Sequence, residues 1–484
     1  MYPAGFDLAA SAYQEMMREG FHPDFSPSIR NQLAAIEARP TEISRNSLRD
    51  LRDVLWSSID NDTSRDLDQI EAAERVSNGI RVLVGIADVD CVVAIGSPID
   101  QHAASETTTV YTAVRNFPML PEALSTDLTS LGEGADRVAI IVEMVVSSEG
   151  SIGSTDVYGA LVRNKAQLTY SGVGAWLEGW GKPDTKVGSS NELASQLKLQ
   201  DEAATALRNQ RYRLGALNFD RVETSATIRN GAVESIAGMK KTRAHDLIED
   251  FMIAANETIA KTLKVKSVPM IRRVVKAPER WARIVELAAG YGEHLPAPPD
   301  SGALNAFLER RRAADPLHYP DLSLAVVKLM GPGEYVMSRP GADDQGHFGL
   351  AATDYTHSTA PNRRFADLVL QRLVKATVAG QGTPYSEDEL NSIARNCTLK
   401  EDAARKVERA MNKRVAAVAL RNRRGETFDA IVTGVTPKGV FVRVLNPPVE
   451  GRLMRGEAGV DVGDRIRVTL LATDPERGYI DFGR

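Results

Sequence analysis

Two long apolar segments of strand character precede three long amphipathic segments of helical character, and this order limits the folds available to the chain. The strand-like segments are residues 80–96 (IRVLVGIADVDCVVAIG), preceded by the turn pair Asn78-Gly79, and residues 136–152 (DRVAIIVEMVVSSEGSI). The helical segments are residues 241–265, 360–380 and 401–425. Strands followed by a helical half predict a large α+β domain.

Helical spacing also marks the beginning of the chain. Residues 7–20 (DLAASAYQEMMREG) and 26–40 (SPSIRNQLAAIEARP) predict two short helices that stop at Gly20 and before Pro40. We expect residues 1–46 to form a helical arm. It is either a helix-turn-helix unit or an arm that packs on the main domain of residues 47–424.

The pattern after Gly425 is one of short alternating strands broken by glycine and proline. Residues 426–453 and 463–483 hold these strands. Five strands in about 60 residues predict a small antiparallel barrel of the OB-fold type at residues 425–484.

Charge is distributed unevenly along the 484 residues. The net charge of −5 excludes a protein that coats nucleic acid through overall positive charge. Residues 395–484 nevertheless contain 18 Lys+Arg against 12 Asp+Glu, so a basic tail follows an acidic body. The two cysteines, Cys91 and Cys397, offer neither a disulfide framework nor a zinc cluster. With no signal-peptide pattern and no apolar run of membrane-spanning length, we expect a cytoplasmic protein that does not enter membranes.

Residues 59–71 (IDNDTSRDLDQIE) hold five carboxylates in thirteen positions. Counted from Asp60, the oxygen-bearing residues follow the spacing of a calcium-binding EF-hand loop up to Glu71. Arg65 contradicts that interpretation, because the sixth loop position needs glycine, and strand-forming residues follow where a helix is required. The remaining alternatives are a solvated acidic loop and one wall of a catalytic site for a hard metal ion.

Further motifs favour the catalytic site. Residues 347–368 (HFGLAATDYTHSTAPNRRFADL) place adjacent arginines at the start of a helix, and residues 115–137 form a proline-punctuated loop region. Clustered acids, arginines that neutralise transferring charge and a nucleic-acid-binding barrel are the components of phosphodiester hydrolysis.

These motifs resemble the ribonuclease II, or RNB, family of 3′→5′ exoribonucleases over about residues 51–424. The family's signature of Asp, five residues, Asp, one residue and two adjacent Asp corresponds to Asp60, Asp66, Asp68 and then Gln69. Residues 84–103, 116–131 and 247–260 resemble further family segments, and YTHSTAPNRRFADL is similar to the family's YTHFTSPIRRYADL. The C-terminal barrel resembles the RNA-binding OB-fold of the ribosomal S-one kind.

The sequence departs from the family pattern at several positions. Gln69 stands where the family has its fourth Asp, and its amide oxygen can coordinate a metal ion without adding charge. Glu106 stands where the family usually has Arg, and Gly85, Ala360 and Asn362 are also changed. Fewer than 50 residues precede the catalytic motifs, so we expect no N-terminal cold-shock barrels.

The resemblance implies processive 3′→5′ hydrolysis of single-stranded RNA to nucleoside 5′-monophosphates, in RNA decay or processing. Asp60, Asp66, Asp68 and Gln69 are the expected ligands of Mg²⁺, or of Mn²⁺ in its place. Asp68, Asp66 and Arg363 are the expected catalytic residues, with Arg363 stabilising charge on the phosphate. We expect a monomer with no organic cofactor.

The resemblance also suggests contacts with RNA. Tyr111 is expected to stack on a base near the 3′ end, and Glu249, or its neighbour Asp250, to bind a ribose 2′-hydroxyl. Arg364 is either a second phosphate contact or half of a structural ion pair.

The barrel adds Phe428, Phe441 and Arg443 as candidates for RNA contacts. One of the two phenylalanines could instead fill the barrel, while alternation places Phe441 and Arg443 on one face that we expect to be solvated. His347 and His357 are interpreted as structural. An RNA-binding relative that has lost catalysis is the second hypothesis, and a calcium-binding protein is the third.

Overall fold

The computed structural model describes residues 6–38, 48–219, 223–229, 232–316, 318–342, 346–437 and 439–484. The expected helix stop at Pro40 and the expected boundary at residue 46 lie outside these ranges. None of the described helices is long and apolar enough to span a membrane.

The centre of the main domain is a six-stranded sheet in the order β1-β8-β2-β3-β4-β7. Because β7 also pairs with β8, the five strands from β8 to β7 close on themselves. The strands are β1 (Arg49–Asp50), β2 (Trp56–Asp60), β3 (Gln69–Val76), β4 (Gly79–Ala87), β7 (Asp136–Val146) and β8 (Ile152–Thr169).

Side-chain alternation divides the apolar residues of this sheet between two cores. Trp56, Ile70 and Leu83 belong to a small core that includes residues of β2, β3, β4, β7 and β8. Ile59 and Val84 belong to the large core that the sheet shares with the helices. Such a two-sided arrangement follows from the period of two along each strand.

The turn between β3 and β4 requires glycine. Gly79 has a φ of +150°, and a Cβ atom there would lie 2.2 Å from the carbonyl oxygen of Val146. The expected strand over residues 80–96 is too long, since β4 ends at Ala87. The N–H of Asp88 still donates to the carbonyl oxygen of Val138 (3.0 Å), but the chain then turns toward α3.

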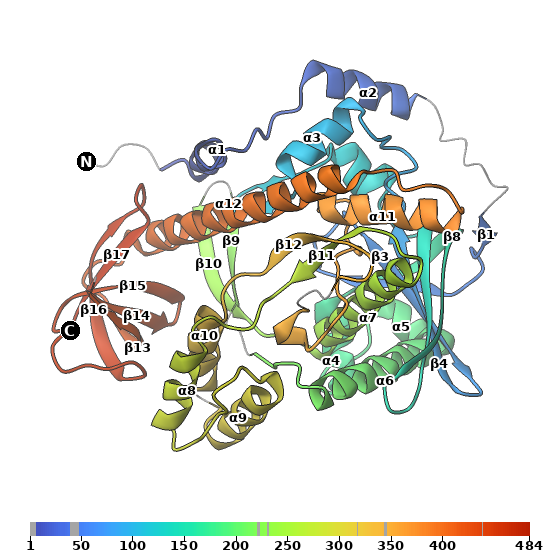
Figure 1. The fold of residues 1–484 in the computed structure, drawn as a ribbon. Helices are drawn as coiled ribbons and strands as arrows, with labels where there is room; N and C mark the ends of the chain where they lie inside the picture. Colours follow the sequence, from blue (N-terminus) through green and yellow to red (C-terminus); the bar gives the residue numbers. More distant parts are fainter. Residues whose placement is uncertain are drawn as a thin grey trace.

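Helices cover the outer face of the sheet (Figure 1). Helix α6 packs on β3 and against α7, and α7 contacts α4 and α11. The helices are α3 (Pro98–Glu106), α4 (Tyr170–Leu177), α5 (Thr185–Ser189), α6 (Asn191–Arg213), α7 (Arg243–Val265) and α11 (Phe365–Val378). The expected helices over residues 241–265 and 360–380 are therefore confirmed as α7 and α11.

Helix α12 (Glu387–Leu420) is much longer than the expected segment of residues 401–425. A capping box between Ser386 and Glu389 begins it, and three acidic residues occupy its first turn, where the helix dipole favours them. Gly425, with a φ of +85°, follows its end. Figure 1 shows α12 running from the main domain to the C-terminal barrel.

The N-terminal arm packs on the main domain. Helix α1 (Leu8–Arg18) lies on α12, whereas α2 (Pro27–Glu37) lies on α3. The two helices belong to different cores, so the arm is not a helix-turn-helix unit that stands apart. Glu106, buried at the end of α3, accepts a hydrogen bond from the backbone N–H of His22 (2.9 Å) and lies 3.8 Å from Nζ of Lys400. Glu106, one of the residues that depart from the family pattern, therefore binds this arm to the end of α3.

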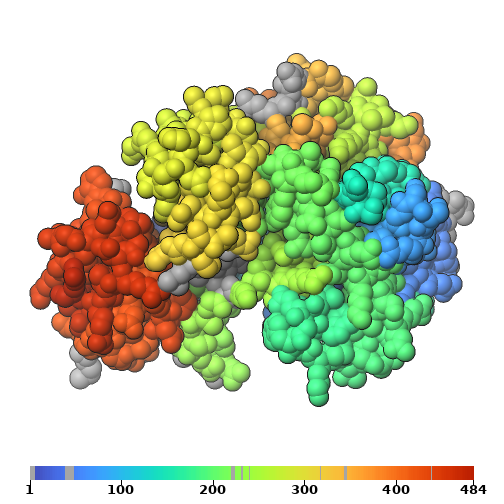
Figure 2. All heavy atoms as spheres, turned by 90° about the horizontal axis from the view of Figure 1, so that it is seen from below, coloured from blue at the N-terminus to red at the C-terminus, as the bar shows by residue number. Residues whose placement is uncertain are grey.

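A second group of helices lies beside the C-terminal barrel (Figure 1). Helices α8 (Trp281–Gly290), α9 (Ser301–Ala314) and α10 (Tyr319–Met330) share a separate apolar core. Two antiparallel pairs complete the region: β11 (Met270–Val274) with β12 (Glu334–Ser338), and β9 (Glu223–Arg229) with β10 (Ala232–Met239). Seen from below, the surface is recessed between the hairpin β9–β10 and the segment of α4 to α6 (Figure 2).

The C-terminal unit is a closed five-stranded barrel in the order β13-β14-β15-β17-β16, which confirms the expected OB-fold. Six of its valines and Phe482 belong to its core, together with Ala417 and Leu420 of α12. The strands are β13 (Thr427–Thr436), β14 (Gly439–Leu445), β15 (Pro448–Arg455), β16 (Arg465–Asp474) and β17 (Tyr479–Gly483).

Candidate active site

The acidic stretch connects two neighbouring antiparallel strands. Strand β2 ends at Asp60 and β3 begins at Gln69, so the loop between them leaves and re-enters the sheet at one edge. Asp66 and Asp68 lie at the end of this loop. A strand follows where an EF-hand needs a helix, which confirms that the stretch is not a calcium-binding loop of that type.

Asp68 joins this edge to the segment that precedes α11. Its side chain is 1% exposed, Oδ1 accepts the backbone N–H of Asn362 (3.0 Å), and Oδ2 accepts Nε–H of Arg363 (3.0 Å). Burial raises the pKa of the Asp68 carboxyl to about 7, although the charge of Arg363 lowers it. The structure thus brings together two expected catalytic residues that lie almost 300 positions apart in the sequence.

Arg363 remains accessible to a ligand. Its side chain is 44% exposed, and only Nε is used in the contact with Asp68. Desolvation lowers the pKa of the guanidinium, but the negative charges around it, that of Asp68 above all, raise the pKa above the ordinary value. A permanently charged fork of N–H groups is well suited to bind phosphate oxygens.

Asp60 and Asp66 are half-buried carboxylates without a cationic partner. Oδ1 of Asp60 accepts the N–H of Asn61 and the hydroxyl of Ser64 (both 2.7 Å), and Oδ2 of Asp66 accepts the hydroxyl of Tyr111 (2.9 Å). Across the described ranges, neither of the two acids forms an ion pair.

Glu71 is a residue of this region that sequence reasoning did not select as a site residue. It is fully buried in β3, two positions after Gln69, and neither carboxylate oxygen has a hydrogen-bond partner among the described residues. Burial, and after it the charge of Asp60, raises the pKa of Glu71 well above its ordinary value. An acidic residue at a buried strand position was the only signal for it in the sequence.

Two tyrosines border the acids. Tyr111 of β5 (Val110–Tyr111), which pairs with β6 (Asn116–Phe117), is 38% exposed and points its hydroxyl at Asp66. Tyr170 begins α4 and stacks on His245 with ring centroids 4.0 Å apart. Burial raises the pKa of Tyr170, and the charge of Asp60 raises it further. Sequence reasoning selected Tyr111 and missed Tyr170.

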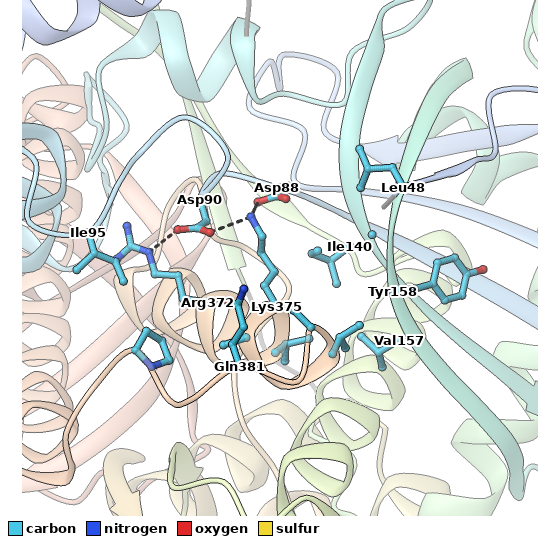
Figure 3. A pocket seen from close by; sticks show the side chains of 16 residues that line it. Leu48, Asp88, Asp90, Ile95, Ile140, Val157, Tyr158, Arg372, Lys375 and Gln381 are labelled. Atoms are coloured by element: carbon cyan, nitrogen blue, oxygen red, sulfur yellow. Dashed lines mark hydrogen bonds and ion pairs between the residues drawn. The ribbon is translucent and has the colours of Figure 1, made fainter. Parts of the chain in front are cut away.

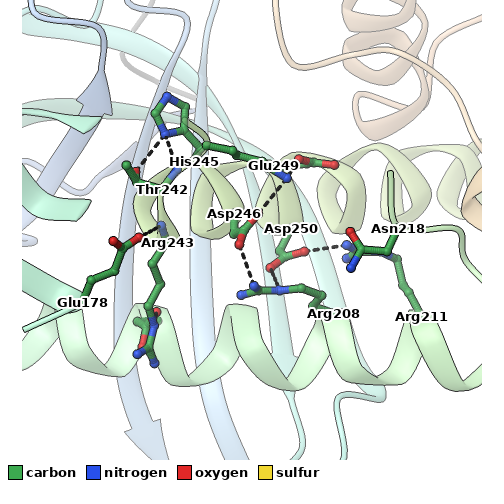
Figure 4. A network of polar contacts seen from close by, with 12 residues as sticks. Glu178, Arg208, Arg211, Asn218, Thr242, Arg243, His245, Asp246, Glu249 and Asp250 are labelled. Atoms are coloured by element: carbon green, nitrogen blue, oxygen red, sulfur yellow. Dashed lines mark hydrogen bonds and ion pairs between the residues drawn. The ribbon is translucent and has the colours of Figure 1, made fainter. Parts of the chain in front are cut away.

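The structure distinguishes the two candidate ribose contacts on α7. Asp250 is buried and accepts hydrogen bonds from Nε of Arg208 (3.1 Å) and Nη2 of Arg211 (2.5 Å), so the alternative in which Asp250 contacts RNA is wrong (Figure 4). Glu249 is exposed and forms an ion pair with Lys241. Figure 4 shows Glu249 on the side of α7 away from Asp250 and α6.

Arg364 is held by Asp367, which is fully buried. Nε and Nη2 of Arg364 donate to the two carboxylate oxygens at 2.9 and 2.6 Å. This bidentate pair favours the structural alternative for Arg364. The two histidines also have structural contacts: Nδ1 of His347 accepts the N–H of Leu350 (3.1 Å), and Nδ1 of His357 lies 2.8 Å from the hydroxyl of Tyr335.

The barrel candidates divide into interior and exterior. Phe428 is 5% exposed inside the barrel, so it is the one of the two phenylalanines that fills the interior. Phe441 and Arg443 flank the fully buried Val442 on the outer face. That face is not freely solvated, however, because Nη2 of Arg443 donates to Oδ1 of Asp321 in α10 (2.8 Å).

The positive charge of the C-terminal region lies in the residues before the barrel. Residues 395–424 contain 10 Lys+Arg and 3 Asp+Glu, whereas residues 425–484 contain 8 and 9. The excess positive charge of the expected basic tail therefore comes from the last part of α12 and from Arg421, Arg423 and Arg424, and the barrel itself is nearly neutral.

A cavity of about 500 Å³ lies at the other end of α11 (Figure 3). Lys375 pairs with Asp88 (2.9 Å) and Asp90 (2.8 Å), and Arg372 pairs with Asp90 (2.9 Å). Because these charges neutralise one another, the cavity offers no free group for catalysis.

The acids at the sheet edge fit a divalent cation by charge and by ligand type. Within the part of the chain that the structure describes, no three His, Cys, Asp or Glu side chains are grouped closely enough to hold an ion as they stand. Among the described residues, Asp60 and Asp66 nevertheless have no cationic partner and both Glu71 oxygens have no hydrogen-bond partner, and hard oxygen ligands suit Mg²⁺ or Mn²⁺.

Comparisons with known proteins identify two regions of the chain. The profile of the RNB domain matches residues 48–380, and that of the RNase II-type exonuclease C-terminal S1 domain matches residues 426–484. The chain is similar to ribonuclease R 1 of Lactococcus lactis (29% identity, covering 92% of this chain and 58% of the relative). It is also similar to ribonuclease R of Thermotoga maritima (30% identity, covering 95% of this chain and 68% of the relative). The chain thus spans 58 to 68% of the length of these two relatives.

The fold matches that of a solved structure. Mycoplasma genitalium RNase R, determined in complex with ribose-methylated single-stranded RNA, superimposes with a TM-score of 0.88 at 22% identity. The match covers 99% of this chain and 78% of that structure. At this identity the similarity concerns the fold alone.

Proposed function

Because this chain belongs to the RNB domain family, we propose that it is a metal-dependent exoribonuclease that hydrolyses single-stranded RNA from the 3′ end. The products are nucleoside 5′-monophosphates, and the activity serves RNA decay or processing. In this proposal, residues 1–46 form a helical arm, residues 47–424 the catalytic unit and residues 425–484 an RNA-binding barrel.

One observation carries the proposal: the contact of buried Asp68 with accessible Arg363, beside carboxylates that lack a cationic partner. Asp60, Asp66, Asp68 and Gln69 would hold Mg²⁺, with Mn²⁺ as a substitute. When bound, the ion supplies Lewis-acid chemistry and neutralises developing negative charge.

The side chains around the acids position the RNA. Asp68 orients Arg363 through Nε, which leaves the terminal nitrogens of Arg363 for the oxygens of the scissile phosphate. Tyr111 presents an exposed ring for stacking on a base, and such stacking is independent of base identity. Glu249 is placed to accept a hydrogen bond from a ribose 2′-hydroxyl once Lys241 moves away.

The test uses 5′-labelled single-stranded RNA with Mg²⁺, for the wild-type chain and for Asp68→Asn. We expect a ladder that shrinks from the 3′ end in the wild type and no shortening in the variant. Asp62→Asn is the matched control, because Asp62 is an exposed acid of the same loop that bonds only to Ser171. This control should retain the wild-type rate.

The neutral Gln69 at the sheet edge supports a second candidate function, that of an RNA-binding protein without catalysis. In that case wild-type RNA would stay intact while it is retarded in a gel, and the retardation would persist in EDTA. Shortening of the RNA that depends on the metal and on Asp68 would exclude this second function.

A further inference from the structure

Glu71 is the most unusual charged side chain near the acidic edge. It is 0% exposed, and both carboxylate oxygens lack a hydrogen-bond partner within the described ranges. Buried carboxylates normally accept several hydrogen bonds or pair with a cation, since desolvation without compensation is costly. Two buried carboxylate oxygens without a hydrogen-bond partner among the described residues therefore indicate that Glu71 binds a ligand.

The surroundings of Glu71 are polar although they are buried. Glu71 faces Ser57 across the β2–β3 pair, and Nε2 of Gln200 lies 3.5 Å from the hydroxyl of Ser57. Oε1 of Gln200 is also buried without a partner. Buried oxygen atoms of Glu71, Ser57 and Gln200 thus occupy positions where apolar side chains would be expected.

Two observations connect Glu71 with the proposed metal ligands. Glu71 lies opposite Ser57 in the β2–β3 pair, and β2 ends three residues further on, at Asp60. Glu71 also follows Gln69 by two positions in β3, and residues with this spacing project from the same face of a strand.

We propose that Glu71 is a further carboxylate ligand of the metal site, and that it supplies the negative charge that Gln69 lacks. This inference rests on the proposed metal-dependent function. With Asp60, Asp66 and Asp68, Glu71 restores four carboxylates at the edge.

The test measures binding of Mn²⁺ to the full-length chain without RNA, by electron paramagnetic resonance of the free ion. We expect Glu71→Gln to weaken Mn²⁺ binding by about tenfold to a hundredfold relative to the wild type. The double variant Gln69→Asp/Glu71→Gln returns a carboxylate to the edge and should recover most of this affinity.

A matched control comes from the same strand. Glu74→Gln makes the same chemical change at an exposed position that pairs with Arg81, and it should bind Mn²⁺ as the wild type does. Thermal unfolding gives a second readout. In EDTA, Glu71→Gln should be at least as stable as the wild type, because a buried group without partners is removed, whereas its stabilisation by Mn²⁺ should be smaller.

The outcomes separate this inference from the proposed function. If the wild type binds Mn²⁺ and Glu71→Gln binds it equally well, Glu71 is a buried acid without a role in the site, and the inference is overturned. If the wild type binds no Mn²⁺, the metal-dependent function falls together with the inference. Should Glu71→Gln fold poorly, Glu71→Ala, which removes the carboxylate without adding bulk, replaces it in the same comparison.

Discussion

Single side chains decide how the candidate site is used. The Asp68 side chain is almost completely buried and accepts a hydrogen bond from Nε of Arg363, whereas 44% of the Arg363 side chain is exposed. Arg364, the next residue, is instead committed to Asp367. Adjacent arginines therefore have separate tasks, because one faces the acidic edge and the other faces the body of α11.

Arg363→Lys should lower kcat by about a hundredfold to a thousandfold. The planar guanidinium can donate to Asp68 and to a phosphate through different N–H groups, and a single ammonium group lacks this geometry. The measurement is single-turnover hydrolysis of labelled RNA. Binding of the same RNA in EDTA should change far less than the rate. Arg75→Lys, at an exposed arginine of β3 paired with Glu202, is the control. Equal rates for Arg363→Lys and the wild type would contradict the proposed role.

Tyr111 offers a ring and a hydroxyl with separable functions. Tyr111→Phe removes the hydrogen bond to Asp66 but keeps the ring, so the affinity for single-stranded RNA should stay near the wild-type value. Tyr111→Ala should weaken that affinity by about tenfold through loss of base stacking. Fluorescence anisotropy in EDTA measures both. An equal loss in the two variants would assign the effect to the hydroxyl instead of the ring.

At the scale of elements, charged groups fix helices relative to one another. Asp250 of α7 joins Arg208 and Arg211 of α6, and Asp246 adds a second contact to Arg208 (Figure 4). Glu249 lies between these residues in the sequence and is exposed. One face of α7 is therefore structural, whereas the adjacent Glu249 pairs with Lys241 on the exposed side.

Asp250→Asn should reduce the free energy of unfolding by about 3 kcal/mol, since two largely buried arginines lose their common carboxylate. Asp246→Asn should cost clearly less, because the Asp246 side chain is more exposed. Urea unfolding followed by tryptophan fluorescence compares the two. If both variants lose the same stability, the α6–α7 contact does not depend on burial of Asp250.

At the scale of the whole molecule, α12 connects all the parts. The helix contacts β12 and α1 along its length, and its C-terminal end packs in the core of the barrel. Arg443 adds a polar contact between the barrel and α10. The barrel is thereby held to the main domain through α12, through the Arg443–Asp321 contact and through the packing of β10 against β15.

The stability of the whole molecule should depend on pH through buried histidine. Burial, and then the charge of Arg273, lowers the pKa of His347 to about 4. The unfolded chain takes up this proton near pH 6.5, whereas the folded chain does not, so stability is complete above pH 6.5 and falls toward pH 4. At pH 5 the loss should be about 1 to 2 kcal/mol, after allowance for partial exposure of the ring.

His347→Asn tests this dependence without removing the local contact. Asparagine can still accept the N–H of Leu350 as a helix cap, but it does not titrate. Urea unfolding at pH 7.5 and 5.0, in EDTA, should show a smaller loss for the variant than for the wild type. An identical loss would assign the pH dependence to other groups, including His357, whose burial also lowers its pKa.

The sequence by itself determined the α+β class, the five-stranded barrel, the long helices and the residues of the acidic edge. Hydrophobic periodicity and the spacing of short motifs are local properties, so they can be read without knowledge of distant partners. The same reasoning excluded the EF-hand, because Arg65 and the following strand pattern are also local.

Only the tertiary structure decided which polar side chains are free and which are paired. Asp250 pairs with arginines of α6, Arg443 pairs with Asp321, and Phe428 lies inside the barrel. Glu71 has no hydrogen-bond partner among the residues that the structure describes. Each of these outcomes depends on groups brought together from distant parts of the chain. The energy of a charge depends on its burial and its neighbours, and these exist only once the elements have packed.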